Sequence, residues 1–511
     1  MDKILVLDFG GQYCHLIARR IRDLGVHSEI LSSDMNVEDL KKVSGVRGMI
    51  LSGGAASVYD KESPKYDSEI LKLGVPILGI CYGHQLIAHI KKGEVKSADS
   101  GEYGTTELKI LKNNDGDALF KDLKKEQKVW MNHKDIVKKL PKEFEIVACT
   151  TESPIAAFEN SKEKLYGVQF HPEVTHTENG LRILENFVFN ICKTKREWTS
   201  ANLVDSIIEE IKLNIGNKKA IIGLSGGVDS STAAILVSKA IGKNLVCVYV
   251  DTGLMRHKET EFIEQVFSKY KLNLKIIRAG DKFFSQLNGI TDPEQKRKII
   301  GRVFIEVFDE VAQKEKADIL IQGTIYSDRI ESGSTKHSAN IKSHHNVGGL
   351  PENVRMKIYE PLRELYKDEV RKLALELKLP DTIAKRHVFP GPGLGIRIIG
   401  EVTPERADIV RRASYIVEDE ITKAGLYEKV WMAFAVLLPI KSVGIQGDSR
   451  SYKYPIVVRI IESKDAMTAN FAKINYSILE KISTRITNEI HEVNRVVYDI
   501  SNKPPATMEW E

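Results

Sequence analysis

The sequence predicts an α/β protein with two doubly wound parallel-sheet domains, followed by a small C-terminal α+β domain. Over residues 1–196, short apolar runs alternate with helical patterns. From residue 197 onward the same alternation begins again, and the last part of the chain reads as helix, two strands, helix and strand. Short buried strands that alternate with helices are typical of parallel sheets with helices on both faces.

In the first domain, strands are expected where apolar runs end in glycine or polar turns. Helices are expected where apolar residues recur every three or four positions. The predicted strands are Lys3–Leu7, Met49–Leu51, Val75–Ile80 and Glu163–Phe170, and the predicted helices are Tyr13–Leu24 and Leu86–Ile90. A charged, weakly periodic stretch at residues 193–198 ends this pattern, so we predict a first domain of residues 1–196.

Two further domains are expected after it. The second has predicted strands at Ala220–Leu224, Leu245–Val250, Leu274–Ile277 and Asp318–Gln322, with a helix from the first strand to about Ile241. Residues 331–352 have no period, which is typical of a functional or disordered loop. The glycine- and proline-rich Phe389–Leu394 marks the next boundary, which predicts domains of residues 197–387 and 388–511. The third has predicted helices at Glu405–Lys423 and Ala469–Val493, and strands at Leu437–Ile445, Tyr454–Ile461 and Arg495–Ile500.

Composition excludes several classes of protein. Of the 511 residues, 75 are Lys or Arg and 70 are Asp or Glu, and no block of like charge forms a nucleic-acid-binding arm. The longest apolar run, Val430–Ile440, is 11 residues, whereas a spanning helix needs about 20. Five scattered cysteines argue against a disulfide framework. We therefore expect a cytoplasmic enzyme without a membrane or nucleic-acid partner.

A first candidate site surrounds Cys81, which lies between glycines where a buried strand turns into a helix. A nucleophile in such a strained turn is exposed to substrate, and the helix N-terminus favours the anionic form of a thiol. The backbone amide of Tyr82 and the turn Gly53–Gly54 could form an oxyanion hole, where the loss of one donor costs about 10²–10³ in rate.

The residues that would serve this cysteine are His171 and Glu173, two positions apart at a strand end. In extended backbone this spacing puts both side chains on one face, so Glu173 can orient the imidazole that acts as base. A cysteine alone is more often a core residue, and a lone His-Pro-Glu is more often a surface turn. Their occurrence together with the glycine turn, in this order, favours catalysis.

Together these residues resemble a class I glutamine amidotransferase domain over about residues 1–196. The resemblance implies that ammonia is released from glutamine through a γ-glutamyl thioester on Cys81. Such domains often have proline after the two glycines, where this chain has Ala55.

A second candidate site is the glycine- and serine-rich loop after the strand Ala220–Leu224. Free backbone amides and a helix N-terminus there form an anion cradle, and no lysine follows the second glycine as in Walker-type loops. The loop resembles that of N-type ATP pyrophosphatases, which split ATP between its α- and β-phosphates. This implies that ATP binds Ser225, Gly226, Gly227, Val228, Asp229, Ser230 and Ser231, and that Asp229 binds Mg²⁺. Asp251 ends the next strand, either as part of this site or as a strand cap.

The whole chain resembles the family of glutamine-hydrolysing GMP synthases. The matching stretches lie in all three segments: Asp251–Arg256, Gly323–Asp328, Lys342–Pro351, Glu360–Glu364, Phe389–Arg397, Gln446–Tyr452 and Lys503–Glu511. The resemblance implies that ATP-Mg adenylates the C2 oxygen of XMP and that ammonia displaces AMP to give GMP. No tightly bound organic cofactor is expected.

The resemblance also implies roles for residues outside the two motifs. XMP would bind Arg256, Asp448, Lys503 and Glu509, with Arg450 as a further cation, while Lys342, His344 and His345 would form a lid. The third segment resembles the family's dimerisation domain, so a homodimer is expected.

Three other functions remain open from the sequence. Another adenylating amidotransferase, such as an NAD or asparagine synthetase, would lack the ending Lys503–Glu511. A tRNA-modifying thiolase shares the loop but needs an RNA-binding surface; Gly444–Gly447 matches a KH-type clamp as a string, yet it ends a strand. A catalytically silent interaction protein is disfavoured by the intact Cys81, His171 and Asp229.

Overall fold

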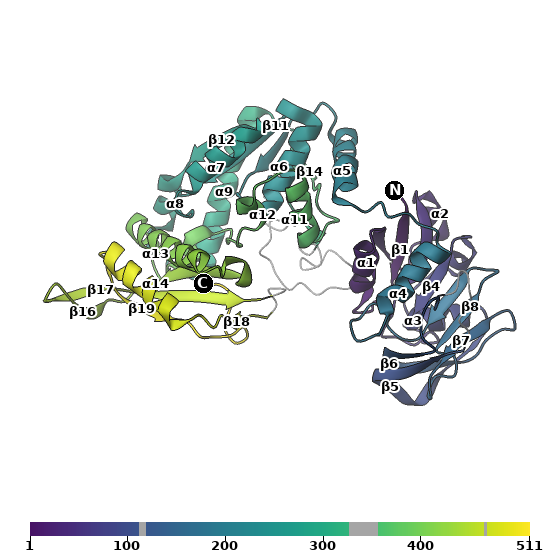
Figure 1. Cartoon of the computed structure of the whole chain (residues 1–511). Helices are drawn as coiled ribbons and strands as arrows, with labels where there is room; N and C mark the ends of the chain where they lie inside the picture. Colours follow the sequence, from purple (N-terminus) through teal and green to yellow (C-terminus); the bar gives the residue numbers. More distant parts are fainter. Residues whose placement is uncertain (112–118, 327–355, 464–467) are drawn as a thin grey trace. The chain divides into compact units, whose positions relative to one another are not determined.

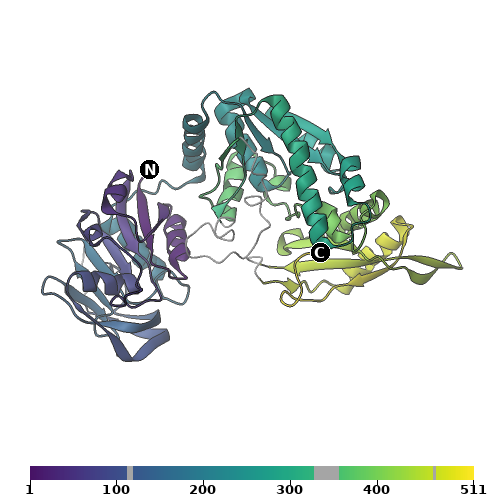
Figure 2. The ribbon, with the colours of Figure 1, turned by 180° about the vertical axis from the view of Figure 1, so that it is seen from behind.

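The computed structural model describes residues 1–111, 119–326, 356–463 and 468–511. The chain divides into two compact units, Met1–Asn202 and Leu203–Glu511, which Figures 1 and 2 show from opposite sides. The predicted lid residues Lys342, His344 and His345 lie outside the described residues. None of the helices in the described ranges is long and apolar enough to cross a membrane.

A nine-stranded sheet forms the centre of the N-terminal unit, in the order β2-β1-β3-β4-β9-β8-β7-β5-β6. The strands are β1 (Lys3–Asp8), β2 (His27–Ser32), β3 (Val46–Leu51), β4 (Ile77–Ile80), β5 (Glu94–Ile110), β6 (Glu126–Lys139), β7 (Glu145–Cys149), β8 (Ala157–Asn160) and β9 (Leu165–Val168). The five strands from β2 to β9 are parallel, which confirms the predicted α/β class with parallel sheets.

The other half of this sheet corrects the expectation of a wholly parallel sheet. Strands β8, β7, β5 and β6 pair antiparallel. Buried and exposed residues alternate along the first part of β6, which is typical of an antiparallel strand with one face in water. No strand was predicted in residues 94–160, although Ile146–Cys149 and Ile155–Phe158 are short apolar runs that cover most of β7 and the start of β8. Strands β5 and β6 are mostly polar in sequence, which hides them from a search for apolar runs.

Helices cover both faces of the parallel half. They are α1 (Cys14–Asp23), α2 (Val37–Lys42), α3 (Tyr82–Ile90) and α4 (Gly180–Glu185). Ile4 and Val6 of β1 pack in the cluster that contains α1 and α4, whereas Leu5 and Leu7 pack in the cluster that contains α2 and α3. Both faces of β1 are therefore buried, which explains why the strand is continuously apolar.

We expect acidification to destabilise the N-terminal unit through His84 of α3, which is fully buried and stacks on Phe158. Burial lowers the pKa of His84 from 6.5 to about 3, although its ring bonds the Ile155 carbonyl. The unfolded chain therefore takes up this proton more readily. The stability that the neutral ring contributes is present above pH 6.5 and is lost as the pH falls towards 3. The loss reaches about 1.4 kcal/mol per pH unit.

Urea unfolding of the N-terminal unit at about pH 7.5 and about pH 5 measures this effect. The native protein should lose more unfolding free energy between these values than His84→Gln. His89→Gln is the matched control, because His89 lies on the same helix and is exposed. Equal pH dependence in all three proteins would contradict the assignment to His84.

The C-terminal unit contains a wholly parallel sheet in the order β12-β11-β10-β13-β14. Its strands are β10 (Ala220–Gly223), β11 (Leu245–Asp251), β12 (Asn273–Arg278), β13 (Ile319–Ile321) and β14 (Lys357–Tyr359). The helices around it are α5 (Ser200–Ile215), α6 (Val228–Ile241), α7 (Glu259–Phe267), α8 (Gly280–Leu287), α9 (Pro293–Glu315), α11 (Lys367–Glu376) and α12 (Asp381–Ala384). The strand order reverses between β10 and β13, and open α/β sheets bind ligands at such a reversal.

A second, mainly antiparallel sheet completes this unit. It contains β15 (Met432–Leu437), β16 (Ser442–Gln446), β17 (Ser449–Glu462), β18 (Asn470–Phe471) and β19 (Val493–Tyr498), with helices α13 (Pro404–Lys423) and α14 (Tyr476–Glu489). One continuous core joins residues of α9 and β11 to residues of α13, β15, β17 and α14. The parallel sheet and the mainly antiparallel sheet of this unit therefore share one apolar core.

Two predicted elements of this sheet are wrong. The expected strand Leu437–Ile445 is split into β15 and β16 around Pro439, which has no N–H for a sheet ladder. The expected helix Ala469–Val493 begins only at Tyr476, because β18 precedes it and the Asn475 side chain caps the helix by accepting from Ser477 N. A capping side chain competes with continued helix at its N-terminal side.

Candidate active sites

Cys81 lies in the sharp turn between β4 and α3, with a positive φ of 53°. The turn depends on its two glycines. A Cβ at Gly79 would lie 2.3 Å from the Gly83 carbonyl oxygen, and a Cβ at Gly83 would lie 2.3 Å from the Leu51 carbonyl oxygen. Strained backbone of this kind persists only where its surroundings force it, and it is frequent at active sites.

His171 lies beside this turn and is oriented by Glu173. Nδ1 of His171 is 2.7 Å from Oε1 of Glu173, and both side chains are buried. Burial lowers the pKa of His171, but interactions with Cys81 and Glu173 outweigh it and leave the pKa raised. Among the described residues, Nε2 of His171 has no hydrogen-bond partner of normal geometry. The second nitrogen is thus available to a reacting group, while the first fixes the ring.

The predicted oxyanion residues surround the same point. A Cβ built on Gly53 would lie 3.4 Å from Cε1 of His171 and 3.8 Å from Cβ of Cys81, so the Gly53 backbone adjoins both. A Cβ on Gly54 would lie 3.3 Å from Cγ of Tyr82. The structure therefore brings together all six residues that the sequence singled out in the N-terminal unit.

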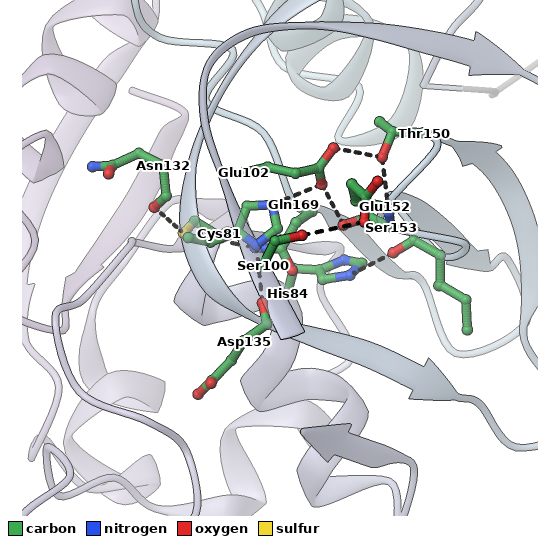
Figure 3. A network of polar contacts seen from close by, with 12 residues as sticks. Cys81, His84, Ser100, Glu102, Asn132, Asp135, Thr150, Glu152, Ser153 and Gln169 are labelled. Carbon is green, nitrogen blue, oxygen red and sulfur yellow. Dashed lines mark hydrogen bonds and ion pairs between the residues drawn. The ribbon is translucent and has the colours of Figure 1, made fainter. Parts of the chain in front are cut away.

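Three polar residues next to Cys81 were missed by the sequence analysis. The Cys81 thiol lies 3.7 Å from the Asn132 carbonyl oxygen and 3.8 Å from Nε2 of Gln169, as Figure 3 shows. Gln85, one helical turn after the cysteine, donates to Gln169 Oε1 at 3.2 Å. The i, i+4 spacing of Cys81 and Gln85 could have revealed the latter. Asn132 lies in β6 and Gln169 directly follows β9, so no local pattern around Cys81 marks them.

In the C-terminal unit, the loop after β10 holds itself in shape through its serines. Oγ of Ser230 lies 2.9 Å from Oγ of Ser225, and Oγ of Ser231 donates to the Gly227 carbonyl at 2.7 Å. Gly226 has a φ of 76°, and Gly227 is the N-cap of α6. The loop residues 225–231 therefore lie together at the N-terminus of a long helix, where backbone amides favour an anion.

Asp229, in the first turn of α6, forms an ion pair that the sequence analysis did not foresee. Its Oδ2 is 2.5 Å from Nζ of Lys367, the first residue of α11. Its Oδ1 is buried and has no partner within the described parts of the chain. Lys367 thus adds a cation to the anion-binding loop, although it lies far away in the sequence.

Asp251 acts as a strand cap in this structure. Its Oδ1 accepts from Gly253 N at 3.0 Å, and its Oδ2 accepts from Thr260 Oγ1 at 2.8 Å. Asp251 also lines a cavity together with Gly253, Arg278 and Lys282, so both interpretations that the sequence left open remain.

Of the candidate XMP residues, Arg256 and Glu509 are linked indirectly, through Arg397 and the ring of Phe389. The guanidinium groups of Arg256 and Arg397 lie 4.6 and 5.2 Å from the Phe389 ring centre. Arg397 holds Glu509 by two hydrogen bonds, of 2.8 and 3.0 Å. Burial, followed by the charge of Arg386, lowers the pKa of Arg256 to about 10, so this side chain remains a cation at neutral pH.

The other two candidates lie elsewhere in the same unit. The Lys503 backbone pairs with Ala469, next to the C-terminal segment. Asp448 lies in the turn between β16 and β17, is exposed and has a φ of 58°. This hairpin projects from the unit on the side away from the C-terminus in both views (Figures 1 and 2). A single chain therefore does not bring Asp448 to Glu509.

Within the described residues, no group of three or more His, Cys, Asp and Glu could hold a metal ion by itself. The structure thus has one site with a cysteine flanked by glycines and a His–Glu pair. It has another with an anion-binding loop where the strand order of a parallel sheet reverses. The presence of both sites in one chain defines a two-site amidotransferase, which has an acyl-transfer centre and a nucleotide site.

Comparison with known proteins narrows this class. The family Glutamine amidotransferase class-I matches residues 5–191, NAD synthase matches residues 199–299, and GMP synthase C terminal domain matches residues 419–510. A GMP synthase [glutamine-hydrolyzing] from Brachyspira hyodysenteriae is 51% identical over 100% of this chain and 99% of its own length. A protein of the same name from Caldanaerobacter subterraneus is 52% identical with the same coverage. The chain belongs to the family of glutamine-hydrolysing GMP synthases, and it is an enzyme that uses glutamine to make GMP.

Proposed function

We propose that glutamine is hydrolysed at Cys81, with His171 as the base and Glu173 as the group that orients it. The observation that carries this proposal is the His171–Glu173 hydrogen bond of 2.7 Å beside the strained Cys81 turn. The thiolate attacks the side-chain amide carbon of glutamine and His171 protonates the departing ammonia. Water activated by His171 then cleaves the thioester and releases glutamate.

The oxyanion formed in both steps would be bound by backbone amides from the Gly53–Gly54 turn and Tyr82. Gly53 adjoins both Cys81 and His171, which supports this role. The carbonyl oxygen of Gly53 accepts from Ser52 Oγ at 2.9 Å, which fixes the orientation of the peptide that follows it. Preorganised donors of this kind stabilise the transition state without reorganisation during the reaction.

We propose further that the loop 225–231 binds the phosphates of ATP and that Asp229 contributes to Mg²⁺ binding. The unpartnered buried Oδ1 of Asp229 fits a hard cation, and Lys367 supplies a second positive charge beside it. Bound Mg²⁺ would neutralise the charge of the phosphates. XMP would bind Arg256, Lys503 and Glu509, with the C2 oxygen adenylated before ammonia displaces AMP.

The three-domain division into residues 1–196, 197–387 and 388–511 is part of this proposal, as are the homodimer and the cytoplasmic location. Support for a dimer comes from the β16–β17 hairpin, which exposes large apolar side chains: Val443 by 51%, Ile445 by 80% and Tyr452 by 65%. Exposed apolar patches of this kind mark interaction surfaces. A second chain would also offer a route by which Asp448 reaches a site.

Product analysis tests the ATP chemistry. With XMP, ATP-Mg and ammonium, we expect one AMP and one pyrophosphate per GMP, because the loop resembles those that cleave between the α- and β-phosphates. Nucleotides are separated by chromatography and pyrophosphate is measured enzymatically. ADP and phosphate as products would contradict the proposal. Deamido-NAD in place of XMP should give no product, and amination of it would favour the NAD synthase alternative.

A further inference from the structure

The two long strands β5 and β6 of the N-terminal unit carry a buried Glu–His pair. Glu102 and His133 are direct partners across these strands, and Nε2 of His133 is 3.1 Å from Oε2 of Glu102. The register shifts beside this pair: Ser97 opposes Asp135, so four residues of β5 lie opposite Lys134 alone. Bulges of this kind are frequent next to active sites, where they redirect side chains.

The Glu102 carboxylate is held by three side-chain donors. Besides His133, Thr150 donates to Oε1 at 2.7 Å and Ser153 donates to Oε2 at 2.6 Å. Burial raises the pKa of Glu102, but the hydrogen bonds from His133, Ser153 and Thr150 outweigh it and lower the pKa. A carboxylate with this many donors is fixed as an anion, and Thr150 and Ser153 anchor it to the connection between β7 and β8.

The His133 ring also contacts the backbone of its own strand, β6. Nδ1 of His133 lies 3.1 Å from the Asp135 carbonyl oxygen, while Nε2 faces Glu102. Both ring nitrogens therefore face oxygen atoms. The ring thereby fixes the backbone of residues 133–135 relative to the Glu102 carboxylate.

The same short segment contacts the reaction centre at both of its ends. At one end, the Asn132 carbonyl oxygen lies 3.7 Å from the Cys81 thiol. At the other, the Asp135 carbonyl oxygen accepts from Gln85 Nε2 at 2.7 Å. Gln85 in turn donates to Gln169, whose Nε2 lies 3.8 Å from the thiol; Figure 3 labels Asp135, Gln169 and Cys81. Glu102 itself does not contact Cys81. It acts on the centre only by holding the segment 132–135.

We propose that Glu102 and His133 are a positioning pair of the glutaminase reaction. They hold the backbone of residues 132–135 so that its carbonyl groups keep the Cys81 thiol and the Gln85 amide in place for glutamine. The inference rests on the proposed role of Cys81 as nucleophile. A misplacement of about 1 Å in such a support can cost on the order of 10²-fold in rate.

Kinetics of Glu102→Gln test the pair, with Glu107→Gln as the matched control because Glu107 is on the same strand and exposed. Glu102→Gln should lower kcat/KM for glutamine about ten- to a hundredfold and leave ammonium-dependent GMP formation unchanged. The double variant with His133→Gln should be no worse than the poorer single variant, since the two residues act as one unit. The nucleotide site belongs to the other unit, so a defect in the fold of the N-terminal unit would also spare the ammonium reaction, and urea unfolding separates the two roles. A positioning role predicts that Glu102→Gln is fully folded in the assay and still has a lowered kcat/KM, whereas a merely structural role predicts a loss that follows the unfolded fraction.

Two outcomes would overturn the proposal: Glu102→Gln equal to Glu107→Gln in glutamine kinetics, or an equal loss with both nitrogen sources. If Glu102→Gln does not fold, Thr150→Val decides, because it removes one of the three hydrogen bonds to Glu102, together with the acceptor of the Ser153 N–H, and should give a smaller, glutamine-specific loss. Cys81→Ala in the same assay separates the two proposals. Full glutamine-dependent activity of Cys81→Ala would refute the role of Cys81 as nucleophile. The comparison of Glu102→Gln with Glu107→Gln tests only the positioning role of the Glu102–His133 pair.

Discussion

Replacement of Cys81 by alanine is expected to lower glutamine-dependent GMP formation by at least about a thousandfold and to leave ammonium-dependent formation intact. The variant has no sulfur to form the thioester, and His171 cannot replace a nucleophile. The positive φ of residue 81 is imposed by Gly79 and Gly83, so the fold of the turn should survive the substitution. The nucleotide site belongs to the other unit and keeps all its residues.

The measurement is GMP formation with glutamine or with ammonium chloride as the nitrogen source, together with glutamate release. Cys149→Ala is the matched control, because Cys149, like Cys81, is a free thiol of the N-terminal unit, although it is only partly buried. It should behave like the native protein with both sources. Equal loss in Cys81→Ala with glutamine and with ammonium would contradict the separation of the two sites.

Replacement of Asp229 by asparagine is expected to lower GMP formation at least about a hundredfold with either nitrogen source. The substitution keeps the shape of the side chain but removes the charge that pairs with Lys367 and that would hold Mg²⁺. Lys367 then loses its carboxylate partner, and the phosphates of ATP lose a cation site. Because ammonia can act only on an adenylated substrate, ammonium cannot restore the reaction.

Pyrophosphate release with XMP, ATP-Mg and ammonium measures this loss directly. Glu294→Gln is the matched control: Glu294 also lies in the first turn of a helix, α9, and it is exposed. The control should retain full activity. Pyrophosphate release by Asp229→Asn at the rate of the control would contradict the proposed role of Asp229 in the reaction. A loss of GMP formation with glutamine alone would instead indicate an effect on the glutaminase site.

Features that depend on residues close together in the sequence could be predicted, and features that depend on distant residues could not. The strand–turn–helix around Cys81 and the loop after β10 were predictable, because each depends on glycines and apolar residues within about a dozen positions. The antiparallel half of the first sheet was missed, since β5 and β6 are half-buried and mostly polar, and the short apolar runs Val129–Met131, Ile146–Cys149 and Ile155–Phe158 were overlooked. Pro439 and Asn475 are local signals for a strand break and a helix start, and they account for the two wrong elements.

Residues that act through distant partners could not be found in this way. Nothing near Asp229 in the chain indicates Lys367, and nothing near Glu509 indicates Arg397, although both pairs are in hydrogen-bond contact. The same holds for Glu102, whose donors come from β6 and from the connection between β7 and β8. Long-range ion pairs leave no periodic or spacing signal, because either partner alone reads as an ordinary charged residue.

From the order of its residues alone, the chain determines two parallel-sheet cores, a cysteine at one strand end and a phosphate-binding loop at another. These features arise from backbone conformation and apolar periodicity, which act between near neighbours. Only the tertiary structure decides which polar groups surround the thiol, how Asp229 is paired, and that the hairpin with Asp448 lies away from the C-terminus. Those arrangements depend on packing between strands and helices far apart in the chain, where burial makes each unpaired polar group costly and so selects its partner.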